Sequence, residues 1–170
     1  MSEKKQLSVL VDTSFLINVY TEDAEHHDVA RKYHKYFLKH NIKMYISTIV
    51  VSEFHQKQTI VELLKTGQYI VAPYNVDDAV ATADLTFKLG GSERRGDAKA
   101  EFKDDIKLMG QAENKDISFI ITGDVNTLAK YCRTLSGMSL FKPEVIVISE
   151  GFSASIFNGG QSALLDDDVE

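Results

Sequence analysis

The sequence predicts an α/β domain with a central, mostly parallel sheet and helices on both of its faces. Three observations indicate this class: four short apolar runs have the length of buried strands, the segments between them repeat apolar residues at helical spacing, and the two kinds of segment alternate. Such alternation is typical of parallel sheets, which need cover on both faces. The 170 residues are enough for one domain whose core needs no disulfide or structural metal.

The N-terminal third predicts two strands, each followed by a helix. Residues 7–11 (LSVLV) form a short apolar run, and a Thr-Ser pair can cap the helix that follows it. An amphipathic helix is expected from Glu22 to His40, because apolar residues repeat on one face and basic residues occupy another. Residues 44–48 (MYIST) form the next predicted strand, and the helix after it is expected to end at Gly67.

The middle of the chain predicts a further helix and a polar connection. After a turn at Pro73, apolar residues at helical spacing predict a helix over residues 76–87. Gly90 and the glycine that follows it close this helix. The next segment, SERRGDAKAEFKD, is expected to be flexible because it is dominated by polar residues.

The C-terminal part predicts two more strands. Helical spacing returns over residues 101–114, residues 118–122 (SFIIT) form a third strand, and a helix follows from Val125 to Leu135. The run VIVIS at 145–149 is the last predicted strand. We therefore expect a single domain over residues 1–150, followed over residues 151–170 by a flexible acidic tail.

The amino-acid composition indicates the cellular compartment of the protein more clearly than its activity. The formal net charge is −6, but the four acids near the C-terminus account for most of it, so the body is nearly neutral. A nearly neutral body argues against a protein that coats nucleic acid non-specifically, but it is compatible with an enzyme that contacts RNA at a few places. The single Cys132 rules out an internal disulfide and a cysteine cage for zinc, and no apolar run is long enough to span a bilayer. We expect a cytoplasmic protein without a membrane anchor.

Two acidic residues follow predicted strands, at the edge where parallel sheets bind ligands. Asp12 comes directly after the first strand, and Asp124 follows the third, where Gly123 allows a sharp turn of the backbone. Each of them could instead be an ordinary N-cap of the next helix. Thr13 and Ser14 can take over the first of these caps, which favours a functional role for Asp12.

Two further acids are expected on helices. Glu53 lies one turn into its helix among apolar neighbours, although a solvated carboxylate would be unremarkable there. Asp105 shares a helical face with Leu108 and Met109, so it is expected to point inward, where a lone carboxylate is costly unless it is paired, protonated or bound to metal. Its neighbour Asp104 is expected on the solvated face. If all four acids converge, they will repel one another and take up protons unless a divalent cation lies among them.

The order and surroundings of these acids resemble the PIN-domain nucleases. The likeness is carried by VDTSFLI, ISTIVVSEF, DDIKLMGQA and FIITGD, and it extends over roughly residues 7–150. It implies a three-layer α/β/α sandwich and an endoribonuclease that uses Mg²⁺ or Mn²⁺ to hydrolyse RNA. The implied catalytic and metal residues are Asp12, Glu53, Asp105 and Asp124.

The resemblance also implies partners and supporting residues. Ser14 and Thr122 are expected to orient a carboxylate by hydrogen bonds, and Arg94 and Arg95 are candidates for contact with RNA phosphates. The family includes toxins of bacterial toxin-antitoxin pairs, so an antitoxin and a second copy of the chain are implied as partners. The loop from Asn114 to Asp116 is a residue longer than the family pattern, which leaves the choice between Asp104 and Asp105 open, and the polar segment from Gly91 to Lys103 is also longer, which could reshape the substrate groove.

Three other classes fit the sequence less well or remain as alternatives. A receiver domain needs an aspartate after a central strand where MYIST has none, and a haloacid-dehalogenase-like phosphatase needs an aspartate at the position of Ser14. The main alternative is a PIN-like module that binds RNA or protein without catalytic turnover.

Overall fold

Five parallel strands form one sheet at the centre of the molecule. The computed structural model describes residues 5–90 and 99–158. The strands pair side by side in the order β3-β2-β1-β4-β5. They are β1 (Ser8–Val11), β2 (Lys43–Ser47), β3 (Tyr69–Ala72), β4 (Phe119–Thr122) and β5 (Glu144–Val147).

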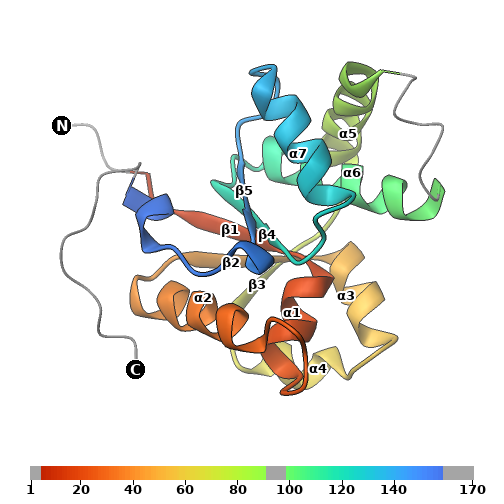
Figure 1. Cartoon of the computed structure of the whole chain (residues 1–170). Helices are drawn as coiled ribbons and strands as arrows, with labels where there is room; N and C mark the ends of the chain where they lie inside the picture. Colours follow the sequence, from red (N-terminus) through yellow and green to blue (C-terminus); the bar gives the residue numbers. More distant parts are fainter. Residues whose placement is uncertain (1–4, 91–98, 159–170) are drawn as a thin grey trace.

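Helices cover both faces of this sheet, which confirms the predicted α/β/α sandwich. Helices α1 to α4 pack on one face and α5 to α7 on the other (Figure 1). Their bounds are α1 (Thr13–Tyr20), α2 (His27–Lys39), α3 (Thr48–His55), α4 (Ile60–Lys65), α5 (Val76–Leu89), α6 (Lys99–Asn114) and α7 (Leu128–Gly137). None of the helices in these described parts combines the length and apolar character needed to cross a bilayer.

The strand order places the ends of β1 and β4 at the centre of the sheet. The chain runs from β1 through β2 to β3 on one side and then returns to place β4 on the other side of β1. Ligands of open parallel sheets bind at such a change of direction, outside the carboxyl ends of the strands. Val11 pairs with Ile121, and the Asp12 amide donates to the Ile121 carbonyl at 3.1 Å. The residues that follow the two strands therefore emerge side by side.

One short strand was missed by the sequence analysis. β3 lies where a turn around Pro73 was expected, and it pairs with β2 alone at the edge of the sheet. Tyr69 and Ala72 are buried, whereas Ile70 and Val71 are about two-fifths exposed. Four residues without alternation give too weak a signal, and only the pairing with β2 defines this strand.

The single helix expected after the second strand is two helices. α3 ends at His55 because the amides of Lys57 and Gln58 both donate to the Phe54 carbonyl, at 2.9 and 2.8 Å. The Gln58 side chain then donates to the Thr21 hydroxyl at 3.0 Å, which ties the break to the end of α1. This tertiary contact leaves residues 56–59 outside a helix.

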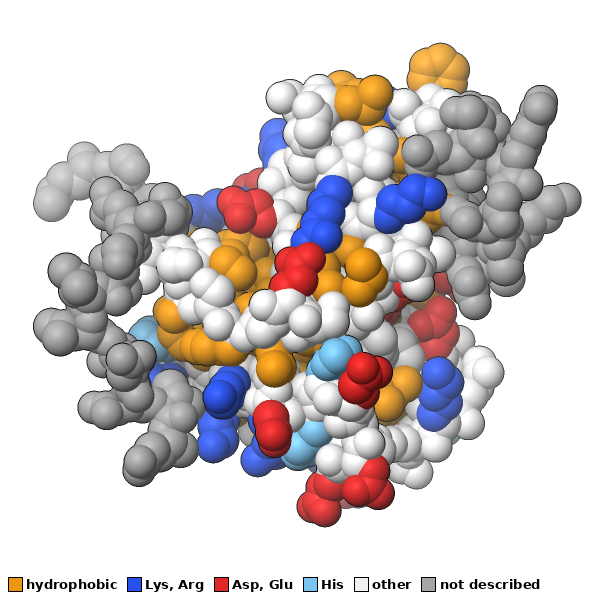
Figure 2. Space-filling model, viewed as in Figure 1, with side chains coloured by type: hydrophobic (Ala, Val, Ile, Leu, Met, Phe, Trp, Pro, Cys, Tyr) orange, Lys and Arg blue, Asp and Glu red, His pale blue; other side chains and the backbone are white. Residues whose placement is uncertain are grey.

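Helix α5 presents its apolar stripe to solvent. Val76, Val80 and Phe87 are 77%, 57% and 85% exposed, and Figure 2 shows hydrophobic side chains at the surface over this end of the molecule. The face turned inward carries the buried Leu85 and Leu89 together with the fully buried Asp78. Asp78 accepts hydrogen bonds from the Asn75 amide and from two amide side chains of α6, so its burial is fully compensated.

The packed domain continues past residue 150, the boundary expected from the sequence. Phe157 in the short helix η3 (Ala154–Asn158) is buried, and its ring meets that of Phe119 at 5.1 Å in an edge-on contact. The Tyr33 hydroxyl donates to the Gly151 carbonyl at 3.0 Å. The acidic run of the expected tail lies outside the described residues.

Candidate functional site

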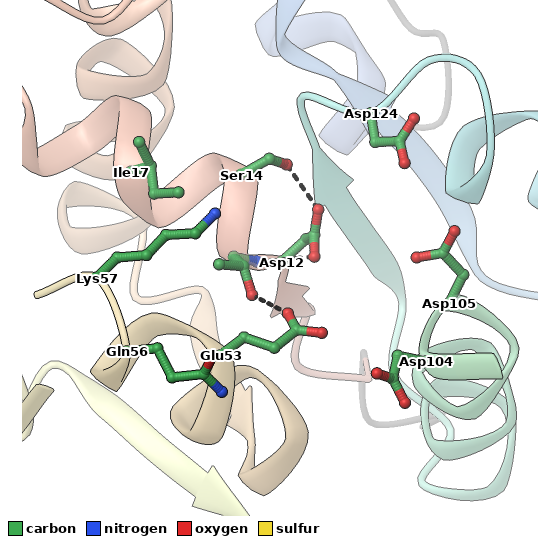
Figure 3. Close-up of a pocket in the computed structure, with 10 residues that line it drawn as sticks. Asp12, Ser14, Ile17, Glu53, Gln56, Lys57, Asp104, Asp105 and Asp124 are labelled. Carbon is green, nitrogen blue, oxygen red and sulfur yellow. Dashed lines mark hydrogen bonds between the residues drawn. The ribbon is translucent and has the colours of Figure 1, made fainter. Parts of the chain in front are cut away.

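All four sequence-predicted acids line one cleft. It has a volume of about 350 Å³ and opens at the carboxyl ends of β1 and β4, between α1 and α3 on one side and α6 on the other (Figure 3). Among the described residues, ten line it: Asp12, Thr13, Ser14, Ile17, Glu53, Gln56, Lys57, Asp104, Asp105 and Asp124. The space suits a small part of a larger ligand together with ions and water.

Asp12 is held rigidly at the floor of the cleft. Its Oδ1 accepts from the Thr13 amide at 2.7 Å, and its Oδ2 accepts from the hydroxyls of Ser14 at 2.6 Å and Thr122 at 2.7 Å. The side chain is 8% exposed. Asp12 is thus the N-cap of α1, as the simpler interpretation had it, but three short hydrogen bonds also fix the direction of its carboxylate.

The two predicted hydroxyl residues connect Asp12 to the β4 end. Ser14 accepts from the Gly123 amide at 2.8 Å, and Thr122 accepts from the Asp124 amide at 2.8 Å. Thr122 is fully buried. Each hydroxyl therefore donates to the carboxylate and accepts from the next loop, so that the ends of β1 and β4 are locked together.

Glu53 reaches the cleft from α3. Its Oε2 accepts a 2.5 Å hydrogen bond from the Thr13 hydroxyl (Figure 3). Burial raises the pKa of Glu53, and the negative charges of Asp12 and Asp104 raise it further, while the Thr13 hydroxyl and Lys57 oppose the rise. The carboxylate is thus destabilised in its ionised form.

Among the acids of the cleft, Asp105 has the surroundings that most disfavour its ionised form. Its Oδ2 is buried and has no hydrogen-bond partner within the described part of the chain. Burial raises the pKa of Asp105 to about 7, against the Thr127 hydroxyl, and the charges of Asp12, Asp124 and Glu53 add to the rise. A buried carboxylate oxygen with no donor is the environment that a cation relieves.

Asp104 and Asp105 both line the cleft but differ in their surroundings. Asp104 is paired with Lys107 at 2.8 Å, and its side chain is 38% exposed, so its charge is already compensated. This agrees with the helical phase that directs Asp105 inward. Asp104 still contributes to the charge felt by Glu53.

Asp124 combines a local structural role with its place in the cleft. Its Oδ1 accepts from the amides of Asn126 and Thr127, at 2.9 and 3.0 Å, and its Oδ2 accepts from the Thr127 hydroxyl. These contacts stabilise the turn that precedes α7, whose N-cap residue is Thr127, so the N-cap alternative for Asp124 was wrong. They also direct the carboxylate toward Asp105, on the same side of the cleft (Figure 3).

The donor set fits a hard divalent cation such as Mg²⁺ or Mn²⁺. Seven of the lining residues in the described part of the chain carry carboxylate or hydroxyl oxygens, which are the ligands these ions take, and one carboxylate oxygen, Oδ2 of Asp105, is buried without a hydrogen-bond partner. In residues 5–90 and 99–158, no three acidic, histidine or cysteine side chains converge closely enough to form a ready-made cage. Mg²⁺ commonly takes one or two carboxylates and completes its shell with water and phosphate oxygens, which the open cleft permits.

Four functional side chains escaped the sequence analysis or were given no definite role there. Thr13 and Thr127 bind the carboxylates of Glu53 and Asp124, and the spacing of Thr127 three residues after Asp124 is a capping signal that could have revealed it. Gln56 and Lys57 line the cleft only because α3 ends before them, which no local pattern predicts. Arg94 and Arg95, the expected phosphate contacts, lie outside the described residues.

The sequence matches no family model and no curated protein. Solved structures do resemble it. VapBC2 from Rickettsia felis bound to a promoter DNA fragment has a TM-score of 0.55 at 13% identity, covering 82% of this chain and 98% of that chain. DNA-bound VapBC from Salmonella typhimurium gives 0.52 at 16%, covering 84% and 98%. VapBC-1 from nontypeable Haemophilus influenzae gives 0.55 at 15%, covering 84% and 99%. These likenesses confirm the PIN-like three-layer fold expected from the sequence.

Proposed function

We propose that the protein is a metal-dependent endoribonuclease that hydrolyses phosphodiester bonds of single-stranded or structured RNA. One observation carries the proposal: Asp12, Glu53, Asp105 and Asp124 line one open cleft. This cleft lies at the carboxyl ends of β1 and β4, where the order of the strands changes direction. Such a cluster of acids would be a liability in a protein that binds no cation. Phosphodiester hydrolysis with bound Mg²⁺ or Mn²⁺ would explain why these four acids are held together.

The residues divide the work according to their surroundings. Asp12, whose carboxylate is fixed by three donors, would hold the cation. Asp105 would have to lose its proton to become a ligand, and because its pKa is raised to about 7, cation binding near neutral pH would displace a proton from this carboxyl group. A bound Mg²⁺ or Mn²⁺ would supply Lewis acidity to the phosphate and lower the pKa of a coordinated water. Glu53, held by Thr13 and with a raised pKa, is suited to orient that water or to accept its proton.

The proposal extends to partners and setting. The similar solved structures are VapBC assemblies, two of them with DNA, which supports a toxin role with a bound antitoxin for this chain. We also propose a homodimer in the cytoplasm. The exposed apolar stripe of α5 supports a second copy as its cover, because Asp77 near the N-terminal end of α5 and Lys88 near its C-terminal end would attract each other in an antiparallel pair.

The test is cleavage of labelled single-stranded RNA with Mg²⁺, with Mn²⁺ or with EDTA. Asp12→Asn is expected to lower cleavage by at least about a hundredfold. It should still fold with a cooperative thermal melt, because the amide oxygen can accept from the Thr13 amide, but it should be less stable than wild type, because its NH2 group replaces the oxygen that accepts from Ser14 and Thr122. Asp23→Asn, at an exposed residue that lies outside both the cleft lining and α5, makes the same change of charge and serves as the control. Full activity of Asp12→Asn, or wild-type cleavage that persists in EDTA, would refute the assignment. RNA binding without any turnover would favour the non-catalytic alternative.

A further inference from the structure

Lys57 is the one basic residue among the described residues that line the acidic cleft. We propose that Lys57 is a substrate-binding residue whose ammonium group contacts a phosphate of the RNA backbone, on the α1 and α3 side of the site. This inference rests on the proposed function, since it names the residue that holds the substrate at the same cleft.

The position of Lys57 follows from the break between α3 and α4. The Lys57 amide closes α3 by donating to the Phe54 carbonyl at 2.9 Å, and the side chain is exposed. Figure 3 shows it extending along the cleft, with its ammonium group directed toward α1, where Ser14 and Ile17 lie. If residues 48–64 formed one continuous helix, a different surface would border this end of the cleft.

The ammonium group of Lys57 has no ion-pair partner within the described ranges, although five acids line the same cleft. Other lysines of the molecule do pair: Lys65 with Glu62 at 2.8 Å and Lys107 with Asp104 at 2.8 Å. Lys57 is close enough to Glu53 to influence its ionisation. Its charge therefore remains available to an anion that enters the cleft.

The two walls of the cleft differ in chemistry. Asp104, Asp105 and Asp124 form the wall on the α6 and α7 side, while Lys57 and Gln56 project from the opposite wall (Figure 3). A polyanion is repelled by the first wall until a cation is bound. On the second wall, which also holds the carboxylate of Glu53 bonded to the Thr13 hydroxyl, the ammonium group of Lys57 is the group that attracts it. A lysine binds phosphate as a point charge and without regard to base, so Lys57 would position the strand rather than select its sequence.

The competing explanation is that Lys57 only offsets the repulsion among the carboxylates. The two roles predict different results for Lys57→Met. If Lys57 only offsets charge, its loss leaves RNA affinity unchanged and alters Mn²⁺ affinity. If Lys57 holds phosphate, its loss weakens RNA binding and reduces the dependence of that binding on salt.

The experiment measures the binding of a fluorescein-labelled single-stranded RNA by anisotropy, with Ca²⁺ in place of Mg²⁺, over a series of salt concentrations. The full chain is compared as wild type, Lys57→Met, Lys57→Arg and Lys35→Met. Lys35 is an exposed lysine of α2, so its variant makes the same change of net charge outside the cleft. A calorimetric Mn²⁺ titration of each variant accompanies the binding series.

Lys57→Met is expected to bind the RNA about tenfold more weakly, and its slope of log K against log salt is expected to be smaller by about 0.7. Lys57→Arg should bind within about twofold of wild type, because it retains the charge. Lys35→Met should match wild type. In cleavage with Mg²⁺, Lys57→Met should raise KM with little change in kcat.

The inference is overturned if Lys57→Met binds RNA with wild-type affinity and salt slope, or if the wild type binds no RNA. An altered Mn²⁺ affinity with unchanged RNA binding also overturns it in favour of the offset of charge. The proposed function fails separately: a wild type that binds RNA through Lys57 but never cleaves it would retain the inference and refute the nuclease.

Discussion

Asp105→Asn should stabilise the metal-free protein at alkaline pH while removing its response to divalent metal. Burial and the charges of Asp12, Asp124 and Glu53 raise the pKa of Asp105 from 3.8 to about 7. The native state therefore binds a proton on Asp105 more tightly than the unfolded chain does. As pH rises from about 4 through 7, the free energy of unfolding must fall, because the native carboxyl is forced to ionise in a site that disfavours the charge.

The size of this effect follows from the shift. A rise of about three pKa units corresponds to about 4 kcal/mol of unfolding free energy at a pH above both values. Water in the open cleft screens part of this charge, which reduces the expected effect to about 1–3 kcal/mol. An asparagine carries no charge at any pH in this range, so Asp105→Asn should be more stable than wild type by this amount at about pH 8 and nearly equal to it at about pH 4.

Urea unfolding with EDTA at several values of pH measures the difference directly. The matched control is Asp104→Asn, which removes an adjacent charge of the same sign that is exposed and already paired with Lys107. It should gain no stability as pH rises. Repeating the series with saturating Mn²⁺ should stabilise the wild type at about pH 8 and should stabilise Asp105→Asn far less, because the ion binds the ionised carboxylate.

Two results would contradict the reasoning. If Asp105→Asn is no more stable than wild type at about pH 8 in EDTA, the carboxylate is not held in a disfavoured charged state. If Mn²⁺ stabilises both proteins equally, Asp105 takes no part in a cation site.

Two further predictions concern the locking of the strand ends and the surface of α5. Thr122→Val removes a buried hydroxyl that donates to Asp12 and accepts from the Asp124 amide. It should lower the free energy of unfolding by about 1–3 kcal/mol, measured by urea unfolding, and weaken Mn²⁺ binding about tenfold, measured by calorimetry. Unchanged Mn²⁺ affinity would show that Thr122 does not orient the carboxylate. Phe87→Ser replaces a side chain that is 85% exposed and should shift the protein from dimer to monomer in light scattering with the melt unchanged, whereas a wild type that is already monomeric would refute the dimer.

The acids illustrate how far local pattern reaches. Asp12 and Asp124 could be assigned to the cleft because each follows a run of apolar residues that ends a buried strand, and parallel strands end at one edge. Asp105 could be separated from Asp104 because helical phase places it on the face with Leu108 and Met109, both of which are buried. The end of a strand and the face of a helix depend on short segments alone, so the folded structure retains them.

Helix α5 shows where local pattern fails. Its apolar residues at helical spacing identified the helix, but the face that packs inward is the one that carries Asp78. Amide side chains of α6 and the cap at Asn75 satisfy this carboxylate, and no sequence rule shows that they lie opposite it. Periodicity finds a helix, while its partners decide which face they cover.

The sequence by itself determined the class of fold and the ends of β1 and β4, and it predicted the four acids that line the cleft, because each of these depends on residues that are neighbours in the chain. Only the tertiary structure decided the edge strand β3, the break that brings Lys57 to the cleft, and the hydrogen bonds that join Asp12 to Thr122 across 110 positions. Those features come from contacts between distant segments. The free energy that fixes them appears only when the chain has packed.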